Sequence, residues 1–186
     1  MSFFQRLFTR RADPRDGARP LYDAVVAAGR TPAWYLAGAP DTLDGRFEIV
    51  TAVLVHTLLR MESDDATKQH SVYLTELFVD DMDGQLRQIG IGDMIVGKHI
   101  GKMMSALGGR LGAYRGVAAD VAALRPVLVR TLWNGADPGV AADDVAAIAA
   151  RFITDLGNVP VADVCAGQLP AIMAAPVPAG APAPGA

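Results

Sequence analysis

A run of acidic side chains is the feature of this sequence that most resembles a chemical site. Glu76, Asp80, Asp81 and Asp83 lie close together in the chain, and grouped carboxylates can hold a divalent cation, which prefers oxygen ligands. On a helix, however, successive side chains are about 100° apart, so residues 80–83 project from different faces instead of converging. We therefore interpret the run as a solvated helix surface and predict no metal site.

Other residues that support catalysis or cofactor binding are few and scattered. Cys165 is the single cysteine, which excludes an internal disulfide and a cysteine-based zinc site. The histidines at 56, 70 and 99 lack the spacing of a metal motif. The glycine-containing run 89–92 follows no predicted strand and lacks the spacing of a phosphate-binding loop. The sequence therefore predicts a protein that is not an enzyme and needs no cofactor.

The acidic run belongs to a helix that we expect to begin near Thr67. Its apolar residues form one broad stripe, typical of a helix that faces a core, and Asp81 and Gln85 fall within that stripe. Burying an unpaired carboxylate is very costly, so Asp81 requires a partner. Two interpretations stay open: contact with another protein, or a structural pair with a cation of a neighbouring helix. The candidate cations are His56, Arg60, Lys98 and His99.

A second helix is predicted from Asp93, a natural N-cap, to Tyr114. One side is apolar and should face the core: Val96, Ile100, Met103, Met104, Leu107, Leu111 and Tyr114. Beside it runs a row of small residues. Glycine inside a helix costs roughly 1 kcal/mol relative to alanine, so the row needs a reason, and close approach of another helix would supply it. That helix is either the protein's own or a partner's. The row consists of Gly97, Gly101, Ser105, Gly108 and Gly112.

Two runs in this region resemble the signature of a known family. The first is Asp44-Gly45-Arg46-Phe47-Glu48, followed by an apolar helix that ends near Arg60. The second run is Asp81-Met82-Asp83, then Leu86-Arg87, Gly90, Gly92-Asp93 and Gly97-Lys98. With these two runs the chain resembles the ubiquinol-cytochrome c chaperone family, the assembly factors of the cytochrome bc1 complex, over about residues 20–115.

The resemblance implies an assembly chaperone of a bacterial bc1 complex that binds the cytochrome b subunit during its maturation. We hypothesise that the small-residue row and the Asp81 region hold an apolar client segment. An alternative from a different class is a helical carrier of an apolar molecule such as a quinone or haem, lined by Met82, Met94, Met103 and Met104. The residues expected to bind the partner are Asp81, Gln85, Arg87, Gly97, Lys98, Gly101, Gly108 and Gly112.

Composition favours an all-α fold. The chain has 186 residues, and its apolar fraction of 51% depends heavily on alanine, with only 6% aromatic residues. We predict a single compact helical bundle of about six to eight helices over 19–169. Residues 1–18 should form an amphipathic segment and linker, and 170–186 a disordered Pro/Ala-rich tail. The net charge of −3 gives no reason to expect nucleic-acid binding.

Within the bundle, the most apolar helix is expected over 44–61, where hydrophobic residues surround the helix almost completely. This pattern predicts a central helix. Further along, Pro126 either kinks one helix or begins a second.

The first eleven residues carry an apolar cluster among arginines. This segment is too short for a membrane span. It is either a disordered or core-docked terminus or an anchor in the lipid interface. Without a transit-type N-terminus, the expected location is the cytoplasm, either free or at the inner membrane. The residues expected to touch a membrane are Phe3, Phe4, Leu7 and Phe8.

Overall fold

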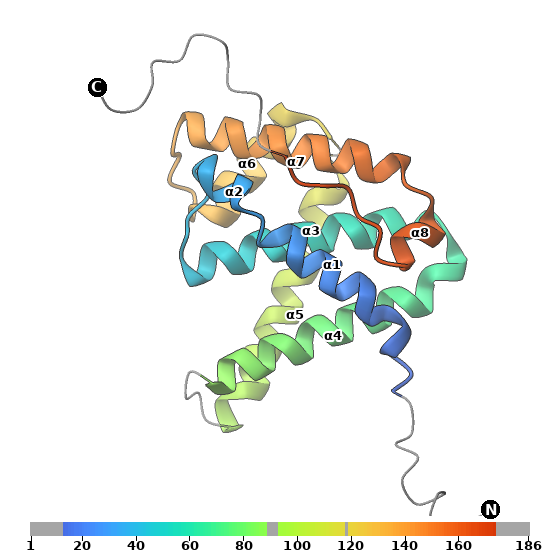
Figure 1. The fold of residues 1–186 in the computed structure, drawn as a ribbon. Coiled ribbons are helices and arrows are strands. Elements are labelled where there is room, and N and C mark those ends of the chain that lie inside the picture. The colour runs from blue at the N-terminus through green and yellow to red at the C-terminus, as the bar shows by residue number, and fades with distance from the viewer. Residues whose placement is uncertain (1–12, 89–92, 118, 174–186) are drawn as a thin grey trace, which may run out of the picture.

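The computed structural model describes residues 13–88, 93–117 and 119–173, and within these ranges it contains helices and no strand. The prediction of an all-α bundle is confirmed (Figure 1). The elements are η2 (Asp16–Ala18), α1 (Arg19–Gly29), α2 (Pro32–Leu36), α3 (Leu43–Met61), η3 (Asp65–Thr67), α4 (Lys68–Gln88), α5 (Asp93–Arg115), α6 (Val121–Leu132), α7 (Val140–Asn158) and α8 (Val161–Cys165).

Helix α3 is the centre of the fold, as its apolar pattern predicts. It packs against α1, α4, α5, α6, α7 and α8, and Val53, Leu54 and Val55 are buried on successive faces. The helix begins where the Thr42 side chain accepts a hydrogen bond of 3.1 Å from the backbone N–H of Gly45. A capping oxygen of this kind satisfies one of the free amides of the first turn.

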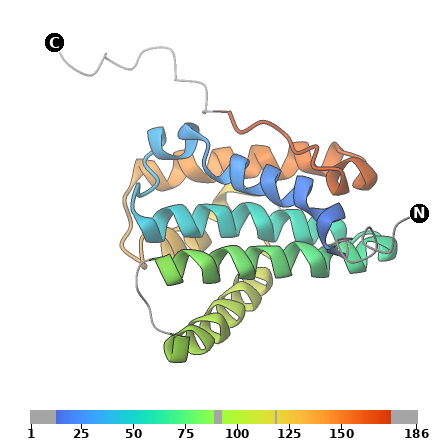
Figure 2. The same ribbon diagram turned by 60° about the horizontal axis from the view of Figure 1, so that its bottom comes forward.

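The remaining helices surround α3 in two groups. Helices α6 and α7 pack against each other on one side, while α4 and α5 form a hairpin on the other, and α1 crosses both α3 and α4 (Figure 1). Figure 2 shows α5 leaving the layer of α3 and α4 at a steep angle, so its first half projects from the body of the bundle. In the described second half of α5, seven residues are exposed: 101, 104, 105, 108, 109, 112 and 115.

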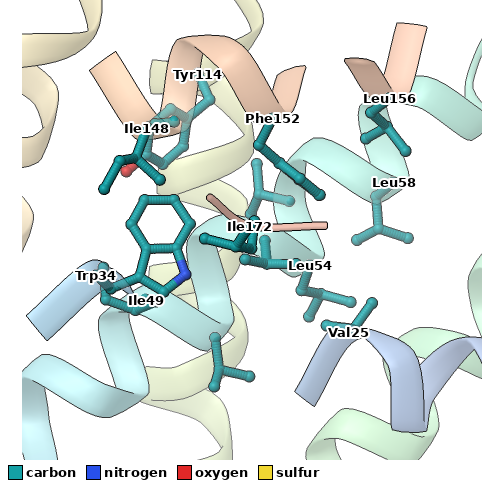
Figure 3. Packing of buried hydrophobic residues seen from close by; sticks show 14 of the residues in the cluster. Val25, Trp34, Ile49, Leu54, Leu58, Tyr114, Ile148, Phe152, Leu156 and Ile172 are labelled. Carbon is teal, nitrogen blue, oxygen red and sulfur yellow. The ribbon is translucent and has the colours of Figure 1, made fainter. Parts of the chain in front are cut away.

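The core is continuous from α1 to the segment after α8. Figure 3 shows the Trp34 ring lying between Ile49 and Ile148, with Phe152 and Tyr114 beyond. The indole N–H of Trp34 donates a 3.0 Å hydrogen bond to the carbonyl of Ala28, which satisfies the polar end of the ring. Aromatic side chains are few, and this one anchors the short helix α2.

Both ends of the predicted domain include more residues than its expected bounds. Residues 13–18, expected to be a linker, contact α4 through an ion pair between Arg15 and Asp80. Hydrogen bonds from Arg15 also lower the pKa of Asp13 to about 2. At the other end, Ile172 is only 9% exposed and belongs to the core, although we expected the tail to begin at residue 170.

The sequence left open whether Pro126 kinks one helix or begins a second. In the structure Pro126 lies inside the single helix α6. Asp120 caps that helix, its carboxylate accepting a 2.9 Å hydrogen bond from the backbone N–H of Ala122.

Candidate partner-binding site

Helix α5 is held to the bundle along one side of its second half. Leu107 and Tyr114 are 3% and 2% exposed there. Between them, the Arg110 guanidinium pairs with Glu48 of α3, with its Nε 2.7 Å from Oε2 and a terminal nitrogen bonded to Oε1. The hydrogen bond with Glu48 raises the pKa of Arg110. Two parallel hydrogen bonds between a guanidinium and a carboxylate fix the relative orientation of the two groups as well as their separation. The pair therefore helps to set the orientation of α5 on α3.

The outer side of the same helix is bare. We define the small-residue face as Gly101, Ser105, Gly108 and Gly112, all of which are exposed. A Cβ atom added to any of these three glycines would find no atom of another residue within 4 Å, apart from neighbouring residues and the helix's own backbone. Packing of this row against the protein's own helices was one of our two interpretations, and among the described residues no other helix packs at these three glycines.

Met104 also departs from prediction. We expected it on the core side of α5, yet it is 42% exposed. Of the stripe residues whose side chains are described, Leu107, Leu111 and Tyr114 contact the core and Met104 does not. Figure 2 shows that α5 runs at an angle to α3 and α4.

Asp81 lies on α4, where Tyr22 of α1 is one partner. The phenol donates a hydrogen bond of 2.5 Å to Oδ2 of Asp81. Burial, together with this bond to a carboxylate, raises the pKa of Tyr22 well above its ordinary value. The sequence argument considered only cations and missed this neutral donor. Two of the predicted cations are engaged elsewhere, since Arg60 binds carbonyls of the α7 end and His56 lies in the core.

The other expected site residues cannot be placed. The side chains of Gln85, Arg87 and Lys98, and the surroundings of Gly97, lie outside the described residues, as do the candidate cation His99 and the expected membrane-contact residues Phe3, Phe4, Leu7 and Phe8.

A pocket of about 300 Å³ lies where α3, the end of α5 and α7 meet. Its wall includes His56, which is only 6% exposed and whose Nε2 makes no hydrogen bond within the described chain. Burial lowers the pKa of this imidazole to about 4, so it is neutral at pH 7. Sequence analysis did not predict this pocket. The one signal was that His56 and Arg60 interrupt the apolar run of the central helix.

Of the four methionines expected to line a carrier, the two that are described lie in different environments. Met82 is 9% exposed and belongs to the core, whereas Met104 is exposed. Met94 and Met103 have side chains outside the described part of the chain. The pocket between α3, α5 and α7 contains none of these residues.

These features define the class of protein. It is an all-helical bundle with one long helix that is bare on its outer side. In the described residues there is no group of side chains that could hold a metal ion. No helix among them is long and apolar enough to cross a membrane.

Comparison with known proteins gives the family. The family model described as ubiquinol-cytochrome C chaperone matches residues 36–172, and the chain belongs to that family. The crystal structure of the Cbp3 homolog from Brucella abortus is similar to this chain, with a TM-score of 0.75, at 27% sequence identity over 91% of this chain and 96% of that chain. A search of the curated proteins gave no significant match. Membership of the family implies a chaperone role toward ubiquinol-cytochrome c reductase, with a subunit of that complex as partner, and not a catalytic role.

Proposed function

We propose that this protein is a non-catalytic assembly chaperone that binds the cytochrome b subunit during its maturation, and that the small-residue face of α5 receives an apolar helix of that client. The family supports the chaperone role. The choice of subunit rests on the resemblance to the family, which implies cytochrome b, a membrane-embedded subunit, as the client. The chemistry of the face suits such a client, because helices of membrane-embedded proteins pack closely where small residues let two backbones approach.

The observation that carries this proposal is the open space outside Gly101, Gly108 and Gly112. Glycine in a helix is unfavourable unless a close contact compensates for it. Among the described residues no such contact exists at these three positions, which supports a partner as the source of the compensation. Met104, exposed beside the face, offers a flexible apolar side chain that adapts to the shape of a bound helix.

The client is held while its own partner subunits are absent and is released when they arrive. An apolar helix of an unassembled membrane protein exposes hydrophobic surface that promotes aggregation. The small-residue face can cover this surface. We expect binding to involve α5 and also the α4 region near Asp81, whose carboxylate accepts a hydrogen bond from Tyr22.

The test replaces Gly101 and Gly108 with leucine in one variant. Nothing lies within 4 Å of a Cβ at either position, and leucine favours helix more than glycine does, so the fold should be retained or slightly stabilised. We expect bc1 assembly in cells to fall strongly, measured as the yield of intact complex on native gels. The control is Gly17→Leu, another exposed glycine with no atom near its Cβ. Normal assembly with the folded double variant would contradict the proposed role of the face.

A further inference from the structure

We propose that the end of the bundle formed by α2 and the first turns of α3 and α7 is a docking surface for a cationic apolar segment of another protein, in which leucine-like side chains stand next to lysines or arginines. This surface shares no residue with the small-residue face of α5. Binding there does not require the client of that face to be cytochrome b.

Exposed aliphatic side chains mark this surface. Leu36, Val140 and Leu43 are 84%, 73% and 65% exposed, and they are the three most exposed large hydrophobic side chains of the described residues. They belong to α2 and to the first turns of α7 and α3, which the fold brings to the same end of the bundle (left in Figures 1 and 2). Single exposed hydrophobic residues are ordinary, but a group of them indicates an interaction surface. We define the end patch as these three residues.

The loop between α2 and α3 connects the three segments. A Cβ added to Gly38 would lie 2.6 Å from the Cβ of Ala141, so this loop touches the first turn of α7. A Cβ added to Gly45 would lie 2.1 Å from the carbonyl oxygen of Pro40, so the same loop touches the first turn of α3. Trp34 is only 3% exposed and fixes α2 to the core. The end patch therefore lies on closely packed backbone.

The charge beside the end patch is negative. Asp44 follows Leu43 in the first turn of α3, and Asp144 lies one turn after Val140 on the same side of α7. Both carboxylates are exposed, and neither forms an ion pair with another described residue. The positive end of a helix carries only about half an elementary charge, which does not neutralise a full carboxylate. Arg30, the C-cap of α1, precedes α2 and offsets part of this charge.

Two other arginines of these segments already have partners. Arg46 pairs with Asp41 at 2.6 Å. Arg125 pairs with Asp137 at 2.8 Å and with Asp143 at 2.7 Å, so one cation serves two carboxylates. The surplus of negative charge at this end of the bundle therefore favours an occupant that brings its own cations.

Negative charge beside exposed aliphatic side chains disfavours three other occupants. A second copy of the chain would bring the same carboxylates together across a two-fold axis. An anionic lipid surface would be repelled. Residues 174–186 have no charged side chain and would leave Asp44 and Asp144 without counter-charges. A segment with both leucine-like and basic side chains matches both features, and such segments occur where membrane helices meet their positively charged cytoplasmic loops.

The test is a titration of three fluorescent peptides of equal length with the full chain at pH 7, measured by anisotropy. The leucine–lysine peptide has four leucines followed by four lysines. The second peptide has glutamates in place of the lysines, and the third has serines in place of the leucines. We expect saturable binding of the leucine–lysine peptide and about tenfold weaker binding of the other two. No saturable binding up to about 1 mM, or equal binding of all three peptides, would overturn the proposal.

Salt separates the two contributions. Raising its concentration from about 50 to about 500 mM should weaken binding of the leucine–lysine peptide several-fold without abolishing it, because screening reduces charge attraction and leaves the apolar contact. Binding that does not change with salt would contradict the role assigned to the carboxylates.

Two double variants locate the peptide. Leu36→Ser with Val140→Ser removes apolar surface, and Asp44→Asn with Asp144→Asn removes charge. Each should weaken binding of the leucine–lysine peptide by about tenfold. All four side chains are exposed, so the fold should be retained, which urea unfolding checks.

Each double variant has a matched control at exposed residues outside the end patch. Val72→Ser with Val121→Ser removes apolar surface on α4 and at the first residue of α6. Asp23→Asn with Glu76→Gln removes two carboxylates on α1 and α4. Both controls should bind the leucine–lysine peptide normally. Normal binding by either test variant, or an equal loss in its control, would place the peptide elsewhere and refute the assignment.

Three measurements test the other occupants. Sedimentation velocity should give the wild-type chain and the Leu36→Ser, Val140→Ser variant the same oligomeric state. Vesicles of phosphatidylcholine and phosphatidylglycerol, about 3:1, should bind both chains equally. Deletion of residues 174–186 should leave the affinity for the leucine–lysine peptide within about twofold. A dimer or vesicle binding that the variant loses, or a large gain of affinity on deletion, would assign the end patch to that occupant and overturn the proposal.

Discussion

Acid should destabilise this fold through His56, and the size of the effect follows from the burial of the ring. Burial lowers the pKa of His56 from its ordinary 6.5 to about 4. Above pH 6.5 the imidazole is neutral in both the folded and the unfolded chain, so protonation of His56 does not reduce the free energy of unfolding. As the pH falls from 6.5 toward 4, the unfolded chain takes up a proton that the folded chain does not, and stability is lost. Between pH 7 and pH 4.5 this linkage amounts to about 2.5 kcal/mol.

The assay is urea unfolding at pH 7, 6, 5 and 4.5, with His56→Phe beside the wild-type chain. The free energy of unfolding of the wild type should fall more steeply with acid, and the difference between the two chains should change by about 2.5 kcal/mol over this range. Carboxylates whose pKa is lowered by hydrogen bonds from arginine, such as Asp13 bound to Arg15 and Asp41 bound to Arg46, lose their contribution mainly below 3.8 and do not disturb this window. Parallel pH profiles for the two chains would refute the reasoning.

Three further tests by urea unfolding probe the start of α3, the contact between α1 and α4, and the contact between α5 and α3. Gly45→Ala should lower the free energy of unfolding by about 2 kcal/mol, because its Cβ would lie 2.1 Å from the backbone carbonyl oxygen of Pro40. The matched change Gly109→Ala places a Cβ that meets no atom of another part of the chain within 4 Å and should raise the free energy of unfolding by up to about 1 kcal/mol. Equal effects of the two changes would contradict the close contact between Gly45 and Pro40. Tyr22→Phe should cost about 1.5–3 kcal/mol, because it removes a hydrogen bond to a carboxylate, and a change under half of that would mean that the bond contributes little. A double-mutant cycle of Arg110→Ala and Glu48→Ala should give a coupling of about 1–2 kcal/mol, and additive effects would show that the pair does not orient α5.

The fold could be read from the sequence where local chemistry is decisive. The apolar run of residues 44–61 predicts the central helix α3 because only full burial accommodates hydrophobic side chains on every face. Helix α1 likewise carries Pro20 in its first turn and ends at Gly29, the residue types that suit these two ends. These signals lie within a few residues of each other, so no knowledge of tertiary contacts is needed.

The candidate site depends on contacts between distant segments, and there the sequence was less informative. The hydrogen bond between Tyr22 and Asp81 joins α1 to α4, across 59 positions of the chain, and a wheel drawn for α4 alone gives no hint of it. The glycines of α5 predicted close packing, but periodicity does not say whether the neighbour is inside the molecule. The exposure of Gly108 and Gly112 in the folded chain, with no described neighbour near their Cβ positions, shows that they are open to solvent.

The central claim, that the small-residue face of α5 receives a bc1 subunit, is tested most directly by photo-crosslinking in cells that are assembling the complex. A photoreactive amino acid at Ser105, in the middle of the exposed face, should form one major crosslink to cytochrome b, and the same group at the exposed Asp144 of α7 should not. Absence of that crosslink from Ser105, in a chain that still supports assembly, would contradict the account.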